Sequence, residues 1–298
     1  MNSAVFKAVI PAAGFGTRML PFTKAVPKEL IPLVDTPVLQ YVIEEAVAAG
    51  ATEILIIISS GKEAVKHHFE SAPELEKRLA YSKKDELLAR MKWLDHPAKL
   101  SFVYQHELDG LGGAMKLASD FAGGDPCMVL LGDCVMDSLS NEPVIAQLIR
   151  VYEKYSASVV ALAQVPPEKI SSYGIAAGSA VADDILKLYD LVEKPSLADA
   201  PSNLAVAARY IFTPGIFNAL QKISRGVNNE LQLTDAIKLL MASEEVYGCR
   251  ICGKRYDLGT PAGFVAANVE FALRRPELQD VLGRRIIEIL KNKNIAEL

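Results

Sequence analysis

The first half of this chain alternates between strand-like apolar runs and helix-like segments, and this alternation limits the possible folds more than any other feature. Glu53–Ser59 is almost continuously apolar and rich in isoleucine, which is typical of a parallel strand covered on both faces. Comparable runs lie at Lys7–Ile10, Leu100–Gln105, Cys127–Asp133 and Ser158–Val165. The pattern predicts an α/β protein with a doubly wound sheet.

Helical patterns separate these runs. Thr36 can cap a helix that starts at Pro37 and ends at Gly50, because proline is favoured in the first turn and glycine after the last one. Further helices are expected at Leu111–Phe121 and from Asn141, as the cap, to Tyr155. The charged segment Glu70–Lys99 also has a helical pattern, and we expect it to be a solvated surface element.

The strands predicted after Val165 lie closer together in the sequence. They are expected at Tyr173–Ala177, Ile185–Glu193 and Leu204–Phe212, which indicates a mixed sheet. Helices follow at Leu231–Ser243, Pro261–Arg274 and Val281–Asn292. We therefore expect a single domain over residues 1–298, with a first half at 1–165, a second half at 166–259 and C-terminal helices at 260–298.

Composition narrows the range of functions. The formal net charge of this 298-residue chain is −4, which argues against a protein that clamps nucleic acid, because such proteins need a basic face. The longest purely aliphatic run, Ile54–Ile58, is far shorter than the ~20 residues of a membrane span. Pro11, Gly14 and Gly16 interrupt the N-terminal apolar stretch, so this stretch does not have the pattern of a signal peptide. We therefore expect a cytoplasmic protein without a membrane partner.

The four cysteines are too few and too dispersed for a disulfide scaffold. Cys249 and Cys252 form a CxxC, but no histidine lies near them at metal-ligand spacing, and Val246–Cys252 has the pattern of a strand. We expect two reduced structural thiols.

The most informative segment begins at Pro11, where the first strand runs into a turn with the sequence PAAGFGTRMLP. Gly14 and Gly16 can take backbone angles that other residues avoid, so the turn can expose its amides to phosphate oxygens. Met19 stands where a dinucleotide fingerprint needs its third glycine, and the Gly-Lys-Ser/Thr of a P-loop is missing. Three cations follow instead: Arg18, Lys24 and Lys28. This arrangement suits a triphosphate whose charge must be neutralised while pyrophosphate leaves.

The continued segment, GFGTRMLPFTKAVPKELIPL, resembles the signature of the sugar-1-phosphate nucleotidyltransferases. Its TRMLP-x-TK-x-x-PKE form is similar to that of the bacterial UTP–glucose-1-phosphate uridylyltransferases, or UDP-glucose pyrophosphorylases. The resemblance covers nearly the whole chain. Its further matches are Gln105 with Gly110-Leu111-Gly112, Leu131-Gly132-Asp133, Tyr173-Gly174, Val192-Glu193-Lys194-Pro195, Ser202-Asn203-Leu204-Ala205, Arg209-Tyr210, the segment from Glu230 to Ala236, and Tyr256-Asp257 with Gly259.

The resemblance implies a Rossmann-like mixed sheet of the nucleotidyltransferase type, with nucleotide bound by residues 1–165 and sugar by residues 166–259. It implies Mg²⁺-dependent transfer of the uridylyl group of UTP to glucose 1-phosphate, by in-line attack without a covalent enzyme intermediate. We expect nucleotide contacts from Ala12, Ala13, Gly14, Gly16, Thr17, Gln105 and Gly110, and sugar contacts from Gly174 and Glu193. We expect Arg18, Lys28 and Lys194 to be catalytic, and Asp133 and Asp257 to hold Mg²⁺.

The residue types suit these roles. The Gln105 amide has both a donor and an acceptor and can pair with the edge of uracil or thymine. Asp133 follows a buried strand, at the edge where open α/β sheets bind ligands, and carboxylates are preferred by Mg²⁺. Taken alone, Asp133 could instead cap a helix and Asp257 could belong to a turn. Similarly, Glu193 and Lys194 could be a surface pair before Pro195.

Several positions depart from the family pattern without removing a charged group. They are Gly113, where the family often has histidine, Cys134 after the metal aspartate, Asn228-Asn229 in place of a Gly-rich pair, and Ala208, where glycine is common. The methyl group of Ala208 is expected near the sugar pocket, so the identity of the sugar stays open.

Because uracil and thymine share their pairing edge, a glucose-1-phosphate thymidylyltransferase is an alternative. A non-catalytic nucleotide-sugar-binding protein is a second alternative, disfavoured by the complete set of charges.

The last expected helix is strongly apolar for the end of a chain. Its aliphatic residues Ile286, Ile287, Ile289 and Leu290 must cover either their own domain or a partner. The resemblance, to a family whose members are commonly dimers or tetramers, favours a homodimer or homotetramer.

Overall fold

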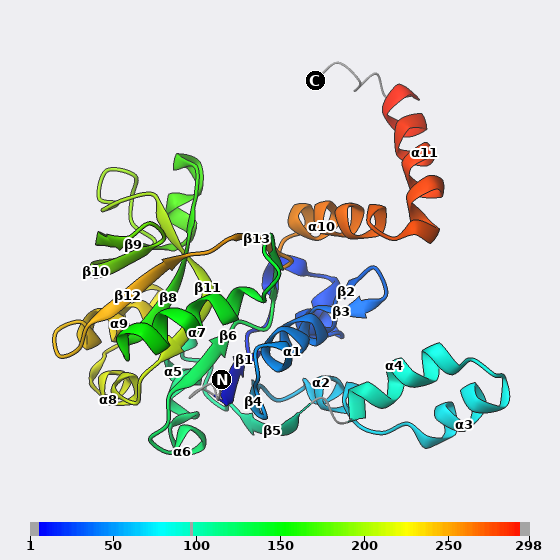
Figure 1. Ribbon diagram of the computed structural model, residues 1–298, viewed down its shortest axis with the longest axis horizontal. Coiled ribbons are helices and arrows are strands. Elements are labelled where there is room, and N and C mark those ends of the chain that lie inside the picture. The colour runs from blue at the N-terminus through cyan, green and yellow to red at the C-terminus, as the bar shows by residue number, and fades with distance from the viewer. Residues whose placement is uncertain (1–5, 96–97, 293–298) are drawn as a thin grey trace.

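The computed structural model describes residues 6–95 and 98–292 and contains a central mixed sheet (Figure 1). The strand order is β5-β4-β1-β6-β11-β8-β12-β10-β9. These strands are β1 (Lys7–Pro11), β4 (Glu53–Ile58), β5 (Lys99–Tyr104), β6 (Cys127–Leu130), β8 (Ser158–Gln164), β9 (Gly174–Ala182), β10 (Ile185–Glu193), β11 (Leu204–Phe212) and β12 (Val246–Arg250). The strands β5, β4, β1 and β6 are parallel, whereas β11 runs antiparallel between β6 and β8. The structure thus confirms a mixed α/β fold.

The apolar strands alternate their side chains between two cores. On β1, Ala8 and Ile10 face one core while Val9 faces the other. The first core is covered by α1 (Val38–Ala48) and α7 (Val144–Tyr155), and the second by α5 (Leu111–Lys116), α8 (Gly215–Lys222) and α9 (Leu233–Leu240). A strand between two such layers must be apolar at every position, which is why β1 and β4 are continuous apolar runs.

Three helices in the first half of the chain differ from those expected. Pro37 is extended (φ −57°, ψ 143°) and forms with Thr36 the short strand β3 (Thr36–Pro37), so α1 starts only at Val38. Asn141 does not cap α7, because Pro143 occupies the N-cap position and disfavours a helical conformation before it. The helix expected over Leu111–Phe121 is divided into α5 and α6 (Ser119–Ala122).

Shorter elements surround the sheet. β2 (Pro32–Leu33) pairs with β3, and β7 (Cys134–Ser138) pairs with β13 (Gly253–Asp257). The loop after β1 contains the 3₁₀ turns η1 (Thr17–Met19), η2 (Phe22–Lys24) and η3 (Lys28–Leu30). Further 3₁₀ turns are η4 (Pro167–Ser172) and η5 (Val227–Asn229). No helix in the described ranges is long and apolar enough to cross a membrane.

Two helical appendages project from the sheet (Figure 1). The first contains α3 (Pro73–Tyr81) and α4 (Asp85–Asp95) and follows α2 (Glu63–His68). None of the α3 side chains is buried, as expected for a solvated element. The second contains α10 (Pro261–Leu273) and α11 (Pro276–Asn292), a longer last helix than expected.

Candidate functional site

Two adjoining cavities, of about 480 Å³ and 680 Å³, lie at the carboxyl ends of β1 and β6 and extend toward β9–β11. They share four lining residues: Thr17, Leu111, Leu131 and Glu230. Every site residue expected from the sequence lines one of the two. The first cavity is lined by Ala12, Ala13, Gly14, Gly16, Thr17, Lys28, Gln105, Gly110 and Asp133. The second is lined by Thr17, Arg18, Gly174, Glu193, Lys194 and Asp257.

The loop after β1 presents unused hydrogen-bond donors to the first cavity. In the described part of the chain, the backbone amides of residues 13–16 donate to no other group. Gly16 has φ +68°, and a Cβ there would lie 3.0 Å from the Lys28 Cβ. Glycine therefore allows both the turn and the close packing of Lys28 beside it. A row of free amides is suited to binding an anion such as phosphate.

Lys62, which the sequence analysis did not single out, holds this loop in place. Its Nζ donates to the Ala12 and Gly14 carbonyls at 2.7 Å each, and lies 2.8 and 2.9 Å from the two oxygens of Glu29. Ser59 Oγ donates to the Ala13 carbonyl at 2.8 Å. Because these carbonyls are bonded behind the loop, the amides remain available on the cavity side.

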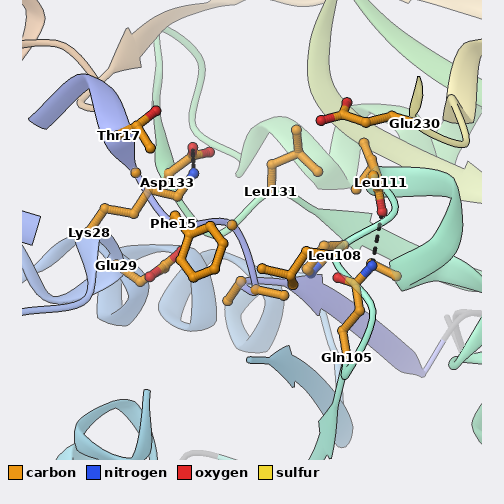
Figure 2. A pocket seen from close by; sticks show the side chains of 17 residues that line it. Phe15, Thr17, Lys28, Glu29, Gln105, Leu108, Leu111, Leu131, Asp133 and Glu230 are labelled. Carbon is orange, nitrogen blue, oxygen red and sulfur yellow. Dashed lines mark hydrogen bonds and ion pairs between the residues drawn. The ribbon is translucent and has the colours of Figure 1, made fainter. Parts of the chain in front are cut away.

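Lys28 and Asp133 form an ion pair at the opposite side of the first cavity from Gln105 (Figure 2). Burial alone would lower the pKa of Lys28, but Asp133 and Glu29 outweigh it and keep that pKa above its usual value. Burial likewise opposes ionisation of Asp133, and Lys28 nevertheless lowers its pKa. The pair is therefore charged, and Lys28 can exchange its partner for a phosphate oxygen.

Asp133 and Asp257 are distant in sequence but adjacent in the fold. Asp257 ends β13 and pairs with Cys134, the neighbour of Asp133. Arg209 Nη2 holds this backbone by donating to the Cys134 carbonyl at 2.9 Å, while its buried guanidinium pairs with Glu45 at 2.7 Å. Two carboxylates at one edge fit Mg²⁺, which keeps several waters and takes its remaining oxygens from phosphates.

Gln105 follows β5 and is buried at the other side of the first cavity. Its Nε2 donates to Asp109 Oδ1 at 3.0 Å and to the Gly110 carbonyl at 3.2 Å. Gly110 has φ +100°, and a Cβ there would lie 2.9 Å from the Leu231 carbonyl oxygen. Glycine is thus required at this position by the fold itself.

Glu193 and Lys194 occupy the second cavity together. Glu193 Oε2 accepts a hydrogen bond from Thr234 Oγ1 at 3.1 Å, and Oε1 lies 3.2 Å from Lys194 Nζ. A Cβ at Gly174 would lie 2.8 Å from the Thr234 side chain and 3.3 Å from Glu193. Lys194 has φ +45°, a strained conformation for lysine. Both side chains therefore line the cavity, with Glu193 largely buried and Lys194 39% exposed.

Arg255 is a cation of the second cavity that the sequence analysis missed. Its guanidinium stacks over the Tyr173 ring, 4.5 Å from the ring centroid, and Nη2 lies 4.0 Å from Asp257 Oδ2. Its buried Nε has no hydrogen-bond partner among the described residues. The only sequence signal was its position two residues before Asp257.

Two of the departures from the family pattern lie at positions with positive φ. Asn228 and Asn229 both have positive φ, 58° and 59°, and asparagine is among the non-glycine residues that best tolerate this conformation. Ala208, with φ +60°, lies where the pairing of β11 with β8 shifts register. Its methyl group lies beside the second cavity in a backbone conformation that favours glycine.

Cys249 is buried, as expected of a structural thiol, whereas Cys252 is exposed. Cys127, Cys134, Cys249 and Cys252 are all free, and no group of three or more His, Cys, Asp or Glu side chains in residues 6–95 and 98–292 could hold a metal ion. β12 contains Cys249 but ends at Arg250, so Cys252 lies just beyond the strand.

Comparisons with known proteins show which family this chain belongs to and which fold it shares. The family model described as Nucleotidyl transferase matches residues 7–273. The UTP–glucose-1-phosphate uridylyltransferase YngB of Bacillus subtilis is 42% identical over 293 residues, 98% of each chain. The structure of a UDP-glucose pyrophosphorylase complexed with UDP-glucose is 36% identical, with a TM-score of 0.85 over 91% of this chain and 100% of that one. A putative glucose-1-phosphate thymidylyltransferase from Bacillus anthracis is 22% identical, with a TM-score of 0.68 over 88% of this chain and 93% of that one, and shares the fold alone.

Proposed function

This chain belongs to the nucleotidyl transferase family, and on that premise we propose that it transfers the uridylyl group of UTP to glucose 1-phosphate. The products are UDP-glucose and pyrophosphate. The observation that carries the proposal is the pair of adjoining cavities, one with free amides, Lys28 and Gln105, the other with Glu193 and Lys194. The names of close full-length relatives support the same reaction.

The reaction requires that two anions meet. A phosphate oxygen of glucose 1-phosphate attacks the α-phosphorus of UTP, a new P–O bond forms, and the bond to the β-phosphate breaks as pyrophosphate leaves. Because the attacking oxygen is already an anion, no general base is needed. The enzyme must neutralise the repulsion and hold the two groups in line.

We assign these tasks to the predicted residues. Arg18, Lys28 and the free amides of the first loop bind the triphosphate, with Ala12, Ala13, Gly14, Gly16 and Thr17 lining its side of the cavity. Gln105 and Gly110 meet the base. Lys194 binds the attacking phosphate, Glu193 and Gly174 meet the sugar, and Arg255 adds a further cation beside that phosphate. Residues 1–165 thus serve the nucleotide and residues 166–259 the sugar, on a sheet of the doubly wound, Rossmann-like type.

We propose that Asp133 and Asp257 hold Mg²⁺. When bound, this ion supplies positive charge to the phosphate oxygens. The supporting observations are the adjacency of the two carboxylates and their oxygen-donor chemistry. Asp133→Asn should abolish turnover and weaken Mg²⁺ binding in a calorimetric titration with UTP present, while the melting temperature stays within a few degrees. Unchanged Mg²⁺ binding would contradict the assignment.

Pyrophosphate release, measured over a panel of nucleoside triphosphates and sugar 1-phosphates, tests the function. We expect the highest kcat/KM for UTP with glucose 1-phosphate. The alternative substrate dTTP differs at the base by one methyl group, which is worth about 1–3 kcal/mol of discrimination. Absence of pyrophosphate release from UTP with every sugar 1-phosphate would refute the proposal. We propose that the reaction takes place in the cytoplasm, which the few and dispersed cysteines favour.

We also propose that the enzyme is a homodimer or homotetramer that buries α11. No α11 residue is buried, and Val281 and Ile287 are 67% and 54% exposed. The helix projects beyond α10, away from the sheet (Figure 1). Such an apolar stripe is typical of an interface. Sedimentation should show an oligomer that dissociates when the residues after Gly283 are deleted, and a monomer in both cases would contradict the proposal.

A further inference from the structure

The orientation of the Gln105 amide is fixed by the protein itself. Its Nε2 donates to Asp109 Oδ1 and to the Gly110 carbonyl, at 3.0 and 3.2 Å. A glutamine amide has two N–H donors, and these two bonds use both of them. The oxygen Oε1 is therefore the Gln105 atom that can bind a ligand in the first cavity.

Asp109 is the stronger of the two restraints. An ionised carboxylate can only accept hydrogen bonds, so it selects the nitrogen side of the amide. The Asp109 backbone is itself held, because its carbonyl accepts from Leu231 N at 2.6 Å and its amide donates to the Glu107 carbonyl at 2.9 Å. Hydrogen bonds to charged groups are worth about twice those between neutral groups.

Gly113 is what makes room for this carboxylate. A Cβ at residue 113 would lie 1.7 Å from Asp109 Oδ1 and 2.3 Å from its carboxyl carbon. Any side chain at this position would displace Asp109. The glycine, which departs from the histidine common in the family, and the aspartate therefore form one structural unit behind Gln105.

We propose that Asp109, seated over Gly113, is a positioning residue that determines which base the enzyme accepts. With Oε1 facing the cavity, Gln105 can accept a hydrogen bond from the N3–H of uracil or thymine. Cytosine has a lone pair at N3, so the same oxygen repels it. The proposal rests on the proposed uridylyl transfer and adds the physical origin of the selection against CTP.

The test compares kcat/KM for UTP and for CTP, each with glucose 1-phosphate, in four variants. Asp109→Asn keeps the shape of the side chain but gives it a donor, so the Gln105 amide can turn. Gly113→Ala expels the carboxylate, and Asp109→Ala removes it. The double variant Asp109→Ala/Gly113→Ala shows whether the two act through one another. Glu107→Gln is the control, since Glu107 lies on the same loop and pairs with the exposed Arg225.

We expect the preference for UTP over CTP to fall about tenfold in Asp109→Asn and at least as much in Asp109→Ala and Gly113→Ala. Adding Gly113→Ala to Asp109→Ala should change the ratio little further, and the control should keep the wild-type ratio. An equal fall in kcat/KM for both nucleotides, with the ratio preserved, would overturn the proposal, because it would mean a merely structural role. Absence of wild-type activity with UTP would instead refute the proposed function.

Discussion

Replacing Lys62 by methionine should destabilise the whole protein and loosen the loop after β1. The side chain is 7% exposed and its partner Glu29 is fully buried. The substitution removes bonds to two backbone carbonyls and leaves the Glu29 carboxylate without its cation. Breaking a buried ion pair in this way costs about 3–5 kcal/mol.

Thermal unfolding measures this cost. At about 2 °C per kcal/mol for a chain of this size, the melting temperature of Lys62→Met should fall by roughly 6–10 °C. The KM for UTP should rise as well, because the free amides of residues 13–16 lose their fixed orientation. Glu29→Leu combined with Lys62→Met removes both charges and should be more stable than Lys62→Met alone.

The comparison of single and double variants can refute this reasoning. If Lys62→Met unfolds within 1–2 °C of the unmodified protein, the ion pair contributes little to stability. If the effects of Glu29→Leu and Lys62→Met simply add, the two side chains do not act as a pair. A normal KM for UTP in Lys62→Met would show that the loop keeps its shape without this anchor.

Three further predictions concern single positions. Lys28→Ala should lower kcat by about a hundredfold or more. Lys194→Ala should lower kcat and also raise the KM for glucose 1-phosphate. Near-normal kinetics, measured with each substrate varied separately, would contradict both assignments. Ala208→Gly should raise the free energy of unfolding by about 0.5–1 kcal/mol in urea, because φ is +60° there, and an unchanged midpoint would argue against strain. Burial raises the pKa of the Cys249 thiol to about 11, so iodoacetamide at pH 8 should label the exposed Cys252 alone, with Cys249 reacting only as the pH approaches 11. Labelling of Cys249 at pH 8, seen by mass spectrometry, would contradict this.

Local and repeated patterns made much of the fold predictable. The strands β1 and β4 could be recognised as apolar runs, because both faces of each strand are buried against a core and their interior positions are therefore apolar. The helix caps predicted at Thr36 and Asn141 were wrong. Pro37 and Pro143, one and two residues after them, have an extended backbone, and each helix starts only after its proline.

The sequence predicted residues that line the two cavities, but it did not predict the residues that hold them in place. Gly14, Gly16 and Lys28 lie within one continuous motif, so the sequence alone shows them together. Lys62 and Arg255 reach the site from other elements, and no local pattern distinguishes them from solvated cations. The pairing of β7 with β13, which brings Asp257 beside Asp133, joins segments more than a hundred residues apart.

The appendage formed by α3 and α4 has a consequence for how the molecule opens. It is inserted between β4 and β5, but these strands pair directly with each other along their whole length, up to Tyr104. Because α3 buries no side chain, its amides should exchange with deuterium through local opening at a small fraction of the global unfolding free energy. α4 stays packed through Leu94, which is buried in the core beside the sheet. Opening of α3 therefore need not disturb the β4–β5 ladder, and Gln105, one residue beyond that ladder, stays in place while α3 melts and re-forms.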